Sequence, residues 1–383
     1  MEDMITLPKG KVLFLVNHEV VIYNFRRELV ERLLAEGYGV FISSPWGERT
    51  NELISMGCQY VEANIERHGT NPLNELKLLL YYRKIIRRIK PDVVLTYTIK
   101  PNIYGGIACQ CYHVPYIVNI TGLGVAVEKE SWIQKIVIMM YKIALKNVSC
   151  LFLQNTENQQ FFIDKNIAVG KHRLIPGSGV NLEHFRLLEY PSDETIEFAF
   201  ISRIMKEKGI EQYLEAAEYI KNKYPNTRFH VCGFCEEGYE EKLVALQEKS
   251  IILYHGMVKD VRTILAFCHC IIHPTYYPEG MSNVLLESIA CGRPIITTNR
   301  SGCREIIDDE VNGYLIKQQN TQDLIDQIER FLHLDYKEKH EMGLHGRLKA
   351  EKEFNRQIIT ESYLEEINLC RGDYNGLQKN NKK

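Results

Sequence analysis

No uninterrupted apolar run in this sequence is long enough to cross a bilayer, which takes about 20 residues in a helix. The nearest approach, residues 132–145, is interrupted by Gln134, Lys135 and Lys142, so we expect no transmembrane span. A strong excess of charge is also absent, because the 383 residues carry a formal net charge of −2. A nucleic-acid-binding chain would be far more basic, so we expect no nucleic-acid partner.

Eleven cysteines are present, but their spacing forms no regular framework, and residues 1–10 lack the apolar run of a secretory signal. We therefore expect reduced thiols and a cytoplasmic location. Cys232 and Cys235 have the spacing of a metal-binding pair, and cysteines and histidines gather over 268–273. A zinc site needs four converging ligands, whereas a strand sends neighbouring side chains to opposite faces. We therefore predict that these cysteines are buried thiols and that no metal is bound.

Short apolar runs alternate along the chain with longer amphipathic stretches, which is the pattern of strand–helix–strand units with parallel sheets. Gly and Pro gather over 176–195 and the pattern then restarts, so the sequence predicts an α/β fold with two Rossmann-like domains. We place the domains at residues 1–180 and 190–355, followed by a C-terminal helix at 356–372. The predicted strands are 11–16, 39–43, 92–96, 116–119, 150–153, 197–201, 228–231, 270–273 and 294–297. The predicted helices are 25–36, 75–90, 102–111, 131–146, 209–223, 239–249, 282–291 and 321–333.

Two carboxylates, Glu279 and Glu287, stand eight residues apart around the start of a predicted helix. The backbone N–H groups of 280–283 are expected to be unpaired at that helix N-terminus, where they would bind an anion such as a diphosphate. The two carboxylates would then accept hydrogen bonds from hydroxyl groups on either side of the anion. The alternative is an ordinary capped helix with solvated glutamates.

Arg203 and Lys208 follow the first predicted strand of the second domain. Arginine offers a planar fork to phosphate oxygens and lysine a point charge, so the pair would stabilise a departing diphosphate. The alternative is a solvated basic turn at the end of a strand.

These two segments resemble glycosyltransferase family 4, a retaining family with the GT-B fold, in which two Rossmann-like domains face a central cleft. Glu279 to Glu287 reproduces the family's Glu-x7-Glu motif, and 203–209 resembles its Arg-Leu-x3-Lys-Gly element, although Ser202 replaces the usual preceding Gly. The resemblance implies that Glu279 contacts the donor sugar, that Glu287 binds ribose hydroxyls, and that Arg203 and Lys208 are electrostatic catalysts. It also implies that the donor is bound by Gly280, Met281, Ser282, Asn283, His255 and Val258, the last two in a loop that meets the base.

In the first half, residues 96–105 and 121–124 resemble the branch of the family that builds capsule, O-antigen and N-glycan precursors on polyprenyl diphosphate. The resemblance implies that the acceptor is bound by Asn24, Lys100, Thr121, Gly122 and Gly124. Many relatives have a His where Lys100 stands, which leaves the role of this position open. The two glycines permit close approach to a phosphate, and a plain turn is the alternative.

The reaction implied is transfer of a hexose or N-acetylhexosamine from a UDP-sugar to a lipid-linked saccharide acceptor in surface polysaccharide assembly. No nucleophile stands at the expected place, so the resemblance implies front-side attack by the acceptor hydroxyl, with no cofactor and no metal. The alternatives are a nucleotide-sugar 2-epimerase of the same fold, which lacks the Glu-x7-Glu motif, and a non-catalytic binder of sugar nucleotides.

Residues 77–90 contain six basic and no acidic residues among apolar ones, and 131–146 has a similar composition. A basic amphipathic helix can lie on an anionic leaflet. Together with the resemblance, this predicts a peripheral protein on the inner leaflet of the cytoplasmic membrane. The alternative is that both are ordinary outer helices with their apolar sides on a sheet.

Overall fold

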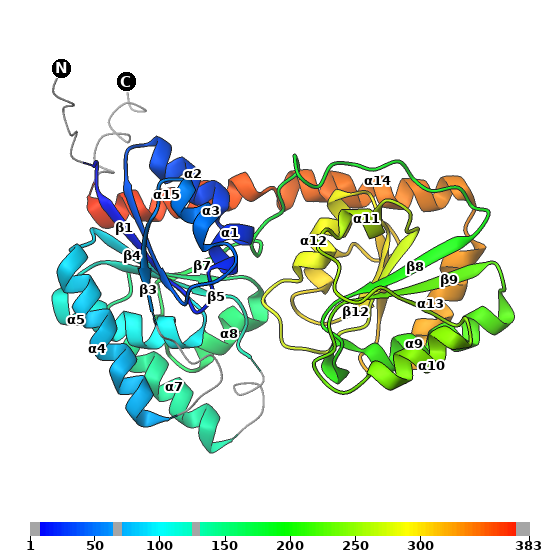
Figure 1. Ribbon diagram of the computed structural model, residues 1–383, viewed down its shortest axis with the longest axis horizontal. Coiled ribbons are helices and arrows are strands. Elements are labelled where there is room, and N and C mark those ends of the chain that lie inside the picture. Colours follow the sequence, from blue (N-terminus) through cyan, green and yellow to red (C-terminus); the bar gives the residue numbers. More distant parts are fainter. Residues whose placement is uncertain (1–7, 64–70, 125–130, 373–383) are drawn as a thin grey trace. The chain divides into compact units, whose positions relative to one another are not determined.

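The computed structural model describes residues 8–63, 71–124 and 131–372, which form two compact units (Figure 1). The first unit runs to Ser178 and resumes at Gln357, and the second comprises Gly179–Arg356. Among the described residues, no helix has both the length and the apolar character that a bilayer-crossing segment requires.

The first unit is built on a seven-stranded parallel sheet with the order β3-β2-β1-β4-β5-β6-β7. Its central strands are apolar on both faces, as expected when helices cover both sides of a parallel sheet. The strands are β1 (Lys11–Leu15), β2 (Gly39–Ser44), β3 (Gln59–Glu62), β4 (Val93–Tyr97), β5 (Tyr116–Ile120), β6 (Cys150–Leu153) and β7 (His172–Leu174).

Helices cover both faces of this sheet, and one of them comes from the C-terminal end of the chain. This last helix, α15 (Arg356–Arg371), packs Ile359, Tyr363 and Ile367 into one of the two apolar cores. The other helical elements are α1 (Val20–Phe25), α2 (Arg27–Ala35), α3 (Thr50–Ser55), α4 (Pro72–Ile89), the π-helical turn η1 (Pro101–Gly105), α5 (Gly106–Tyr112), α7 (Trp132–Ala144) and α8 (Thr156–Asp164).

The second unit has a six-stranded parallel sheet with the order β10-β9-β8-β11-β12-β13 and its own core on each face. Its strands are β8 (Ile196–Ile201), β9 (Thr227–Cys232), β10 (Leu253–Tyr254), β11 (Cys270–His273), β12 (Ile295–Thr298) and β13 (Gly313–Ile316). Its helical elements are η2 (Lys206–Lys208), α9 (Ile210–Lys223), α10 (Glu240–Glu248), α11 (Arg262–Leu265), α12 (Asn283–Ala290), η3 (Arg304–Ile306), α13 (Thr321–His333) and α14 (Tyr336–Glu353).

The predicted α/β class with two Rossmann-like domains is confirmed, since each unit is a parallel sheet covered by helices. The predicted single helix at 25–36 is wrong in its start. The structure has two helices there, α1 and α2, separated at Arg26, whose φ of −138° is not helical. The predicted helix at 102–111 begins instead with the π-helical turn η1.

Candidate functional site

The predicted donor-binding residues lie at the carboxyl edge of the second sheet, where open α/β sheets bind their ligands. Arg203 follows β8, His255 follows β10, and Glu279 follows β11. Backbone hydrogen bonds connect the loops of this edge: Ser202 N–H donates to Cys232 O at 3.0 Å, and Gly233 N–H donates to Gly256 O at 2.8 Å. Residues that are distant in the sequence therefore share one edge.

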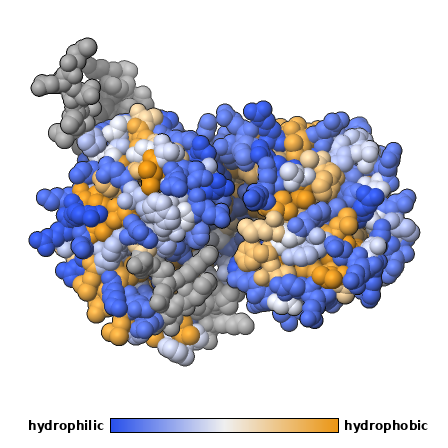
Figure 2. All heavy atoms as spheres, viewed as in Figure 1, coloured by the Kyte–Doolittle hydropathy of each residue, from blue (hydrophilic) through white to orange (hydrophobic). Residues whose placement is uncertain are grey.

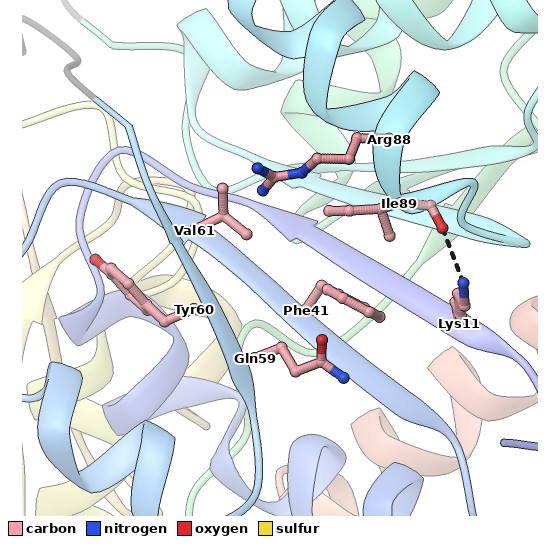
Figure 3. A pocket seen from close by; sticks show the side chains of 7 residues that line it. All are labelled: Lys11, Phe41, Gln59, Tyr60, Val61, Arg88 and Ile89. Carbon is pink, nitrogen blue, oxygen red and sulfur yellow. Dashed lines mark hydrogen bonds between the residues drawn. The ribbon is translucent and has the colours of Figure 1, made fainter. Parts of the chain in front are cut away.

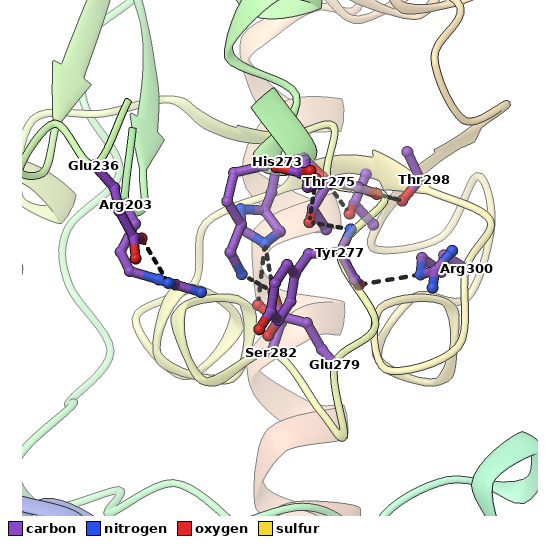
Figure 4. A network of polar contacts seen from close by, with 12 residues as sticks. Arg203, Glu236, His273, Thr275, Tyr277, Glu279, Ser282, Thr298 and Arg300 are labelled. Atoms are coloured by element: carbon purple, nitrogen blue, oxygen red, sulfur yellow. Dashed lines mark hydrogen bonds and ion pairs between the residues drawn. The ribbon is translucent and has the colours of Figure 1, made fainter. Parts of the chain in front are cut away.

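At the centre of the site, the ammonium group of Lys208 forms an ion pair with the carboxylate of Glu279. Glu279 lies close to Tyr277 and Ser282 in Figure 4. The side chain of Lys208 is 8% exposed and that of Glu279 16%, so this is a largely buried pair. His273 Nε2 lies 3.7 Å from Glu279 Oε1 and 3.3 Å from Ser282 Oγ. The β11 strand and the loop after it thus supply three of the four groups.

The charges around Glu279 determine its protonation. Burial disfavours the charged carboxylate, but Lys208 and His273 outweigh burial and lower the pKa of Glu279 to about 2. Burial also lowers the pKa of His273, despite the nearby carboxylate. Glu279 is therefore ionised at neutral pH and acts as a hydrogen-bond acceptor, as binding of sugar hydroxyls would require.

Arg203 and Lys208 stand over the same aromatic ring, that of Tyr277. The Arg203 guanidinium carbon lies 5.2 Å and Lys208 Nζ 4.8 Å from the ring centroid. Arg203 Nη1 also donates to Glu236 Oε2 at 2.6 Å, and its side chain remains 35% exposed. Two cations on one ring at a sheet edge form a site that can receive a ligand anion.

The start of α12 differs from the prediction. Ser282 N–H donates to Gly302 O at 2.8 Å, so the expectation of unpaired amides across 280–283 is wrong at Ser282. Gly302 has φ of +89°, and a Cβ there would lie 2.9 Å from Gly280 O. The 302 loop therefore packs directly on the Glu279–Gly280 backbone, a tertiary contact that the local sequence does not indicate.

The remaining predicted donor-binding residues surround this centre. Met281 and Ser282 are buried, Gly280 is buried, and Asn283 opens α12. Val258 is half-buried and packs against the core between the sheet and α12.

Glu287 lies on α12 as well, four residues after Asn283, which opens this helix. Burial raises the pKa of Glu287 to about 7, with Asp260 raising it further and Arg356 partly opposing the change. A carboxylate with this pKa is ready to exchange a proton when a polar ligand arrives.

The predicted acceptor residues follow three neighbouring strands of the first sheet. Asn24 lies on α1 after β1, Lys100 follows β4, and Thr121 follows β5. Gly122 and Gly124 have φ of +145° and +72°, conformations that favour glycine.

Lys100 stands beside the most irregular backbone of the first unit. Its Nζ lies 2.7 Å from Glu75 Oε1, a partner on α4 that the sequence did not indicate. Thr98, two residues earlier, has φ of +69°, which is strained for a β-branched residue. The π-helical turn η1 begins directly after Lys100, and such turns are frequent at functional sites.

A groove of about 400 Å³ lies at the opposite, amino edge of the first sheet (Figure 3). It is lined by Lys11, Phe41, Gln59, Tyr60, Val61, Arg88 and Ile89. None of these residues belongs to the predicted site. Of the thiols predicted to be buried, Cys232, Cys268 and Cys270 are buried, whereas Cys235 is only partly buried. Across the described ranges, no three His, Cys, Asp or Glu side chains gather into a group that could hold a metal ion.

Several residues of the site were missed by the motifs. Tyr277, Glu236 and Glu75 gave no sequence signal, because their partners come from other elements. Glu197 and His230 did give a sequence signal, because each is a polar residue within a predicted buried strand.

Two family models match this chain. One, described as glycosyl transferases group 1, matches residues 188–349, and the other, described as glycosyl transferase 4-like, matches residues 11–155. The two matched regions carry, respectively, the cation–carboxylate cluster and the strand ends with Lys100 and Thr121. The protein is therefore a glycosyltransferase.

Curated relatives match over most of the chain. A Campylobacter jejuni protein named N,N'-diacetylbacillosaminyl-diphospho-undecaprenol alpha-1,3-N-acetylgalactosaminyltransferase is 24% identical over 371 residues, which are 92% of this chain and 97% of the relative. An Escherichia coli UDP-Gal:alpha-D-GlcNAc-diphosphoundecaprenol alpha-1,3-galactosyltransferase is 27% identical over 279 residues, 67% of this chain and 70% of the relative.

Among solved structures, Anabaena Alr3699/HepE in complex with UDP aligns with a TM-score of 0.77 at 16% identity, covering 93% of this chain and 98% of the other. This similarity supports the GT-B fold. Residues 188–349 match the group 1 glycosyl transferases and residues 11–155 the 4-like domain, and together these matches confirm the predicted resemblance to family 4.

Proposed function

We propose that this glycosyltransferase moves a hexose or N-acetylhexosamine from a UDP-sugar to a saccharide carried on polyprenyl diphosphate, with retention at the anomeric carbon. The observation that carries the proposal is the cluster of Arg203, Lys208 and Glu279 around Tyr277. The names of the C. jejuni and E. coli relatives support the lipid-linked acceptor, and the UDP-bound Anabaena structure supports a uridine nucleotide.

In the proposed mechanism, the acceptor hydroxyl attacks the donor sugar on the face that the diphosphate leaves. Arg203 and Lys208 stabilise the negative charge that grows on the diphosphate, and Glu279 binds donor-sugar hydroxyls. Fixed charges in a partly buried site are effective because they need little reorganisation during the reaction. These two cations take the place of a divalent metal, and no cofactor takes part.

Transfer from labelled UDP-sugars to a polyprenyl-diphosphate-linked saccharide tests the proposal. Arg203→Ala and Lys208→Ala should each lower kcat by about two orders of magnitude or more, as for the loss of other oxyanion donors. Lys206→Ala is the matched control, because Lys206 is in the same short helix but its side chain is 61% exposed.

Arg203→Ala is the more decisive variant, since Arg203 is partly exposed and its loss leaves the buried Lys208–Glu279 pair intact. Near-normal turnover in both alanine variants would contradict the proposed role. An inverted anomeric configuration in the product, read by NMR, would contradict retention.

We further propose that the first unit contacts an anionic membrane through α4 and α7. On α4 the exposed Leu73, Leu76 and Leu80 are followed by the exposed Arg83, Lys84, Arg87 and Arg88. On α7 the exposed residues are Trp132, Ile133, Lys135, Ile136, Met139, Lys142 and Ile143, with no acid among them. Apolar residues appear on this side of the first unit in the surface view (Figure 2).

An ordinary outer helix buries its apolar side on the sheet, as α4 does with Leu78, Tyr82 and Ile86. The helix α7 is different, because five of its large apolar side chains point outward in addition to those that pack inward. Several large apolar side chains that face outward from one helix are expected where lipid or protein covers it. Exposed lysines and arginines beside it favour an anionic surface as the partner.

A further inference from the structure

The 302 loop, which connects β12 to η3, borders the segment that carries Glu279. Arg300 Nε donates to Tyr277 O at 3.0 Å, and this hydrogen bond is drawn in Figure 4. Gly302 O accepts from Ser282 N–H at 2.8 Å. Tyr277 comes two residues before Glu279 and Ser282 three residues after it. The 302 loop is therefore hydrogen-bonded to the chain on both sides of this carboxylate.

The contact between Gly302 and Glu279 is also close. Gly302 has φ of +89°, which favours glycine. A Cβ at this position would lie 2.9 Å from Gly280 O, 3.2 Å from Glu279 O and 3.3 Å from Glu279 Cβ. Because no space separates the two segments here, a shift of the 302 loop would displace Glu279.

One side chain, that of Glu305 on η3, holds the 302 loop. Its Oε2 accepts from Gly302 N–H at 2.7 Å, and its Oε1 accepts from Ser301 Oγ at 3.0 Å. Ser301 and Gly302 are buried, whereas Glu305 is half-buried. Removal of the Glu305 carboxyl group would leave a buried N–H without its acceptor, which favours a rearrangement of the loop.

We propose that Glu305 is a positioning residue, which holds Glu279 in the place where it binds hydroxyl groups of the donor sugar. The proposal rests on the proposed function, which gives Glu279 that role. Arg203 and Lys208, which bind the diphosphate in the proposed mechanism, are carried by the segment after β8. Loss of Glu305 should therefore weaken binding of the sugar and leave binding of the UDP moiety unchanged.

Calorimetric titration with UDP and with a UDP-sugar tests this role. The UDP-sugar is whichever of UDP-glucose, UDP-galactose and their N-acetylhexosamine counterparts supports transfer. In Glu305→Ala the affinity for the UDP-sugar should fall about five- to tenfold, the value of one hydrogen bond, while the affinity for UDP stays within about twofold. Gly302→Ala should have the same effect, because its Cβ would press on Gly280 O.

Two control variants keep the binding of the UDP-sugar normal. Glu305→Gln should retain it, because the amide oxygen can accept from Gly302 N–H and the amide nitrogen can donate to Ser301 Oγ. Asp309→Ala is the matched control, because Asp309 Oδ1 accepts from a backbone N–H of the same unit, that of Leu315, at 2.9 Å. It should leave both affinities unchanged.

A double-mutant cycle separates positioning from a general loss of structure. In Glu279→Ala the group that Glu305 positions is already absent. Adding Glu305→Ala to this variant should therefore change the affinity for the UDP-sugar less than about twofold. A merely structural role of Glu305 would give the same loss of affinity with and without Glu279.

The inference is overturned if Glu305→Ala binds the UDP-sugar normally, if it loses affinity for UDP and the UDP-sugar equally, or if its effect persists in Glu279→Ala. When the unaltered protein still transfers sugar from a UDP-sugar, these results leave the proposed function standing. If none of the UDP-sugars is transferred and Glu279→Ala binds them as the unaltered protein does, the inference and the proposed function both fail.

Discussion

Glu287 is the carboxylate whose environment makes it most sensitive to pH near neutrality. Burial raises its pKa from the usual 4.5 to about 7, so its side chain carries a proton in about half of the molecules at pH 7. A raised carboxyl pKa stabilises the folded ligand-free protein at low pH, and this contribution is lost as the pH rises through 7. Ribose hydroxyls that donate to the ionised form would bring the pKa down again.

Donor binding should therefore release a proton and strengthen as the pH rises to about 7. At pH 6 only about one-tenth of Glu287 is ionised, so affinity should be up to about tenfold weaker than at pH 8. A UDP-sugar is the suitable ligand, since its diphosphate does not titrate in this range. Calorimetry in buffers of different ionisation enthalpy measures the proton release, and Glu287→Gln should abolish both effects. A pH-independent affinity in the unaltered protein would contradict the assignment of Glu287 to the ribose.

Arg203 and Lys208 also predict how the enzyme responds to chelators. Because these cations neutralise the leaving diphosphate in the proposed mechanism, transfer activity should survive excess EDTA. Complete loss of activity that Mg²⁺ or Mn²⁺ restores would show that the diphosphate is neutralised by a metal instead. The assay needs only the unaltered enzyme with and without the chelator.

For individual site residues, the sequence identified those whose motif partners are only a few positions away in the chain. Glu279 and Glu287 could be identified because only seven residues lie between them, and Arg203 and Lys208 because only four do. The ion pair between Lys208 and Glu279 spans 71 residues, so no local pattern contains it. The pairing of Ser282 N–H with Gly302 O was missed for the same physical reason.

The helix α15 contributes a buried polar network beneath the predicted acceptor residues. Asn119 Nδ2 donates to Tyr363 Oη at 2.5 Å, and Asn102 Nδ2 donates to Asn119 O at 3.0 Å. The buried guanidinium of Arg26 lies 5.2 Å from the Tyr363 ring centroid and 5.3 Å from that of Tyr97. These residues are close in the chain to Asn24, Lys100 and Thr121, so one tyrosine of α15 connects all three predicted acceptor segments.

Tyr363→Phe removes the hydroxyl that accepts from Asn119 and leaves a buried donor without its partner. Unfolding free energy in urea should fall by about 1–3 kcal/mol, the usual effect of such a loss. We also expect KM for the lipid-linked acceptor to rise while UDP affinity is unchanged. Tyr82→Phe is the control, because Tyr82 Oη is buried and has no hydrogen-bond partner among the described residues. Equal effects of the two substitutions would argue against a specific role for the network.

Elements with a clear hydrophobic period were predictable, and those without one were not. The strand at 150–153 and the helix at 321–333 agree with β6 and α13 to the residue, because each is apolar at the expected spacing and has clear end signals. The helix α14 was not predicted. Its sequence is mostly polar and its buried positions include Lys339, Gly343 and Gly346, so no apolar stripe marks it.

Charge is distributed unevenly over the whole molecule. Residues 1–190 contain 22 Lys and Arg against 18 Asp and Glu, although the complete chain has a net charge of −2. Four exposed residues of α4, Arg83, Lys84, Arg87 and Arg88, carry part of this positive charge. The excess is thus placed where the proposed membrane contact needs it.

Sedimentation with phosphatidylglycerol vesicles tests the membrane contact. Each basic residue near an anionic surface contributes about 1 kcal/mol, so four of them can hold the protein reversibly. The protein should pellet with vesicles at low salt and less so in 0.5 M NaCl, because surface charges are screened beyond about 8 Å at physiological ionic strength. Changing Arg83, Lys84, Arg87 and Arg88 to Ser should reduce pelleting.

The apolar part of the proposed membrane contact needs a separate variant. Insertion of Trp132 and Met139 into the leaflet would not be weakened by salt. Changing both to Ser should remove the fraction that stays bound in 0.5 M NaCl, because burial of apolar area in the leaflet is not screened. The matched control changes Lys242, Lys249, Lys259 and Lys337, four exposed lysines of the second unit, to Ser. If this control lowers pelleting as much as the α4 variant, the attraction depends on total charge and not on the α4–α7 surface. If the unaltered protein stays in the supernatant with vesicles of any charge, the surface does not bind lipid, and a water-soluble sugar acceptor becomes the better proposal.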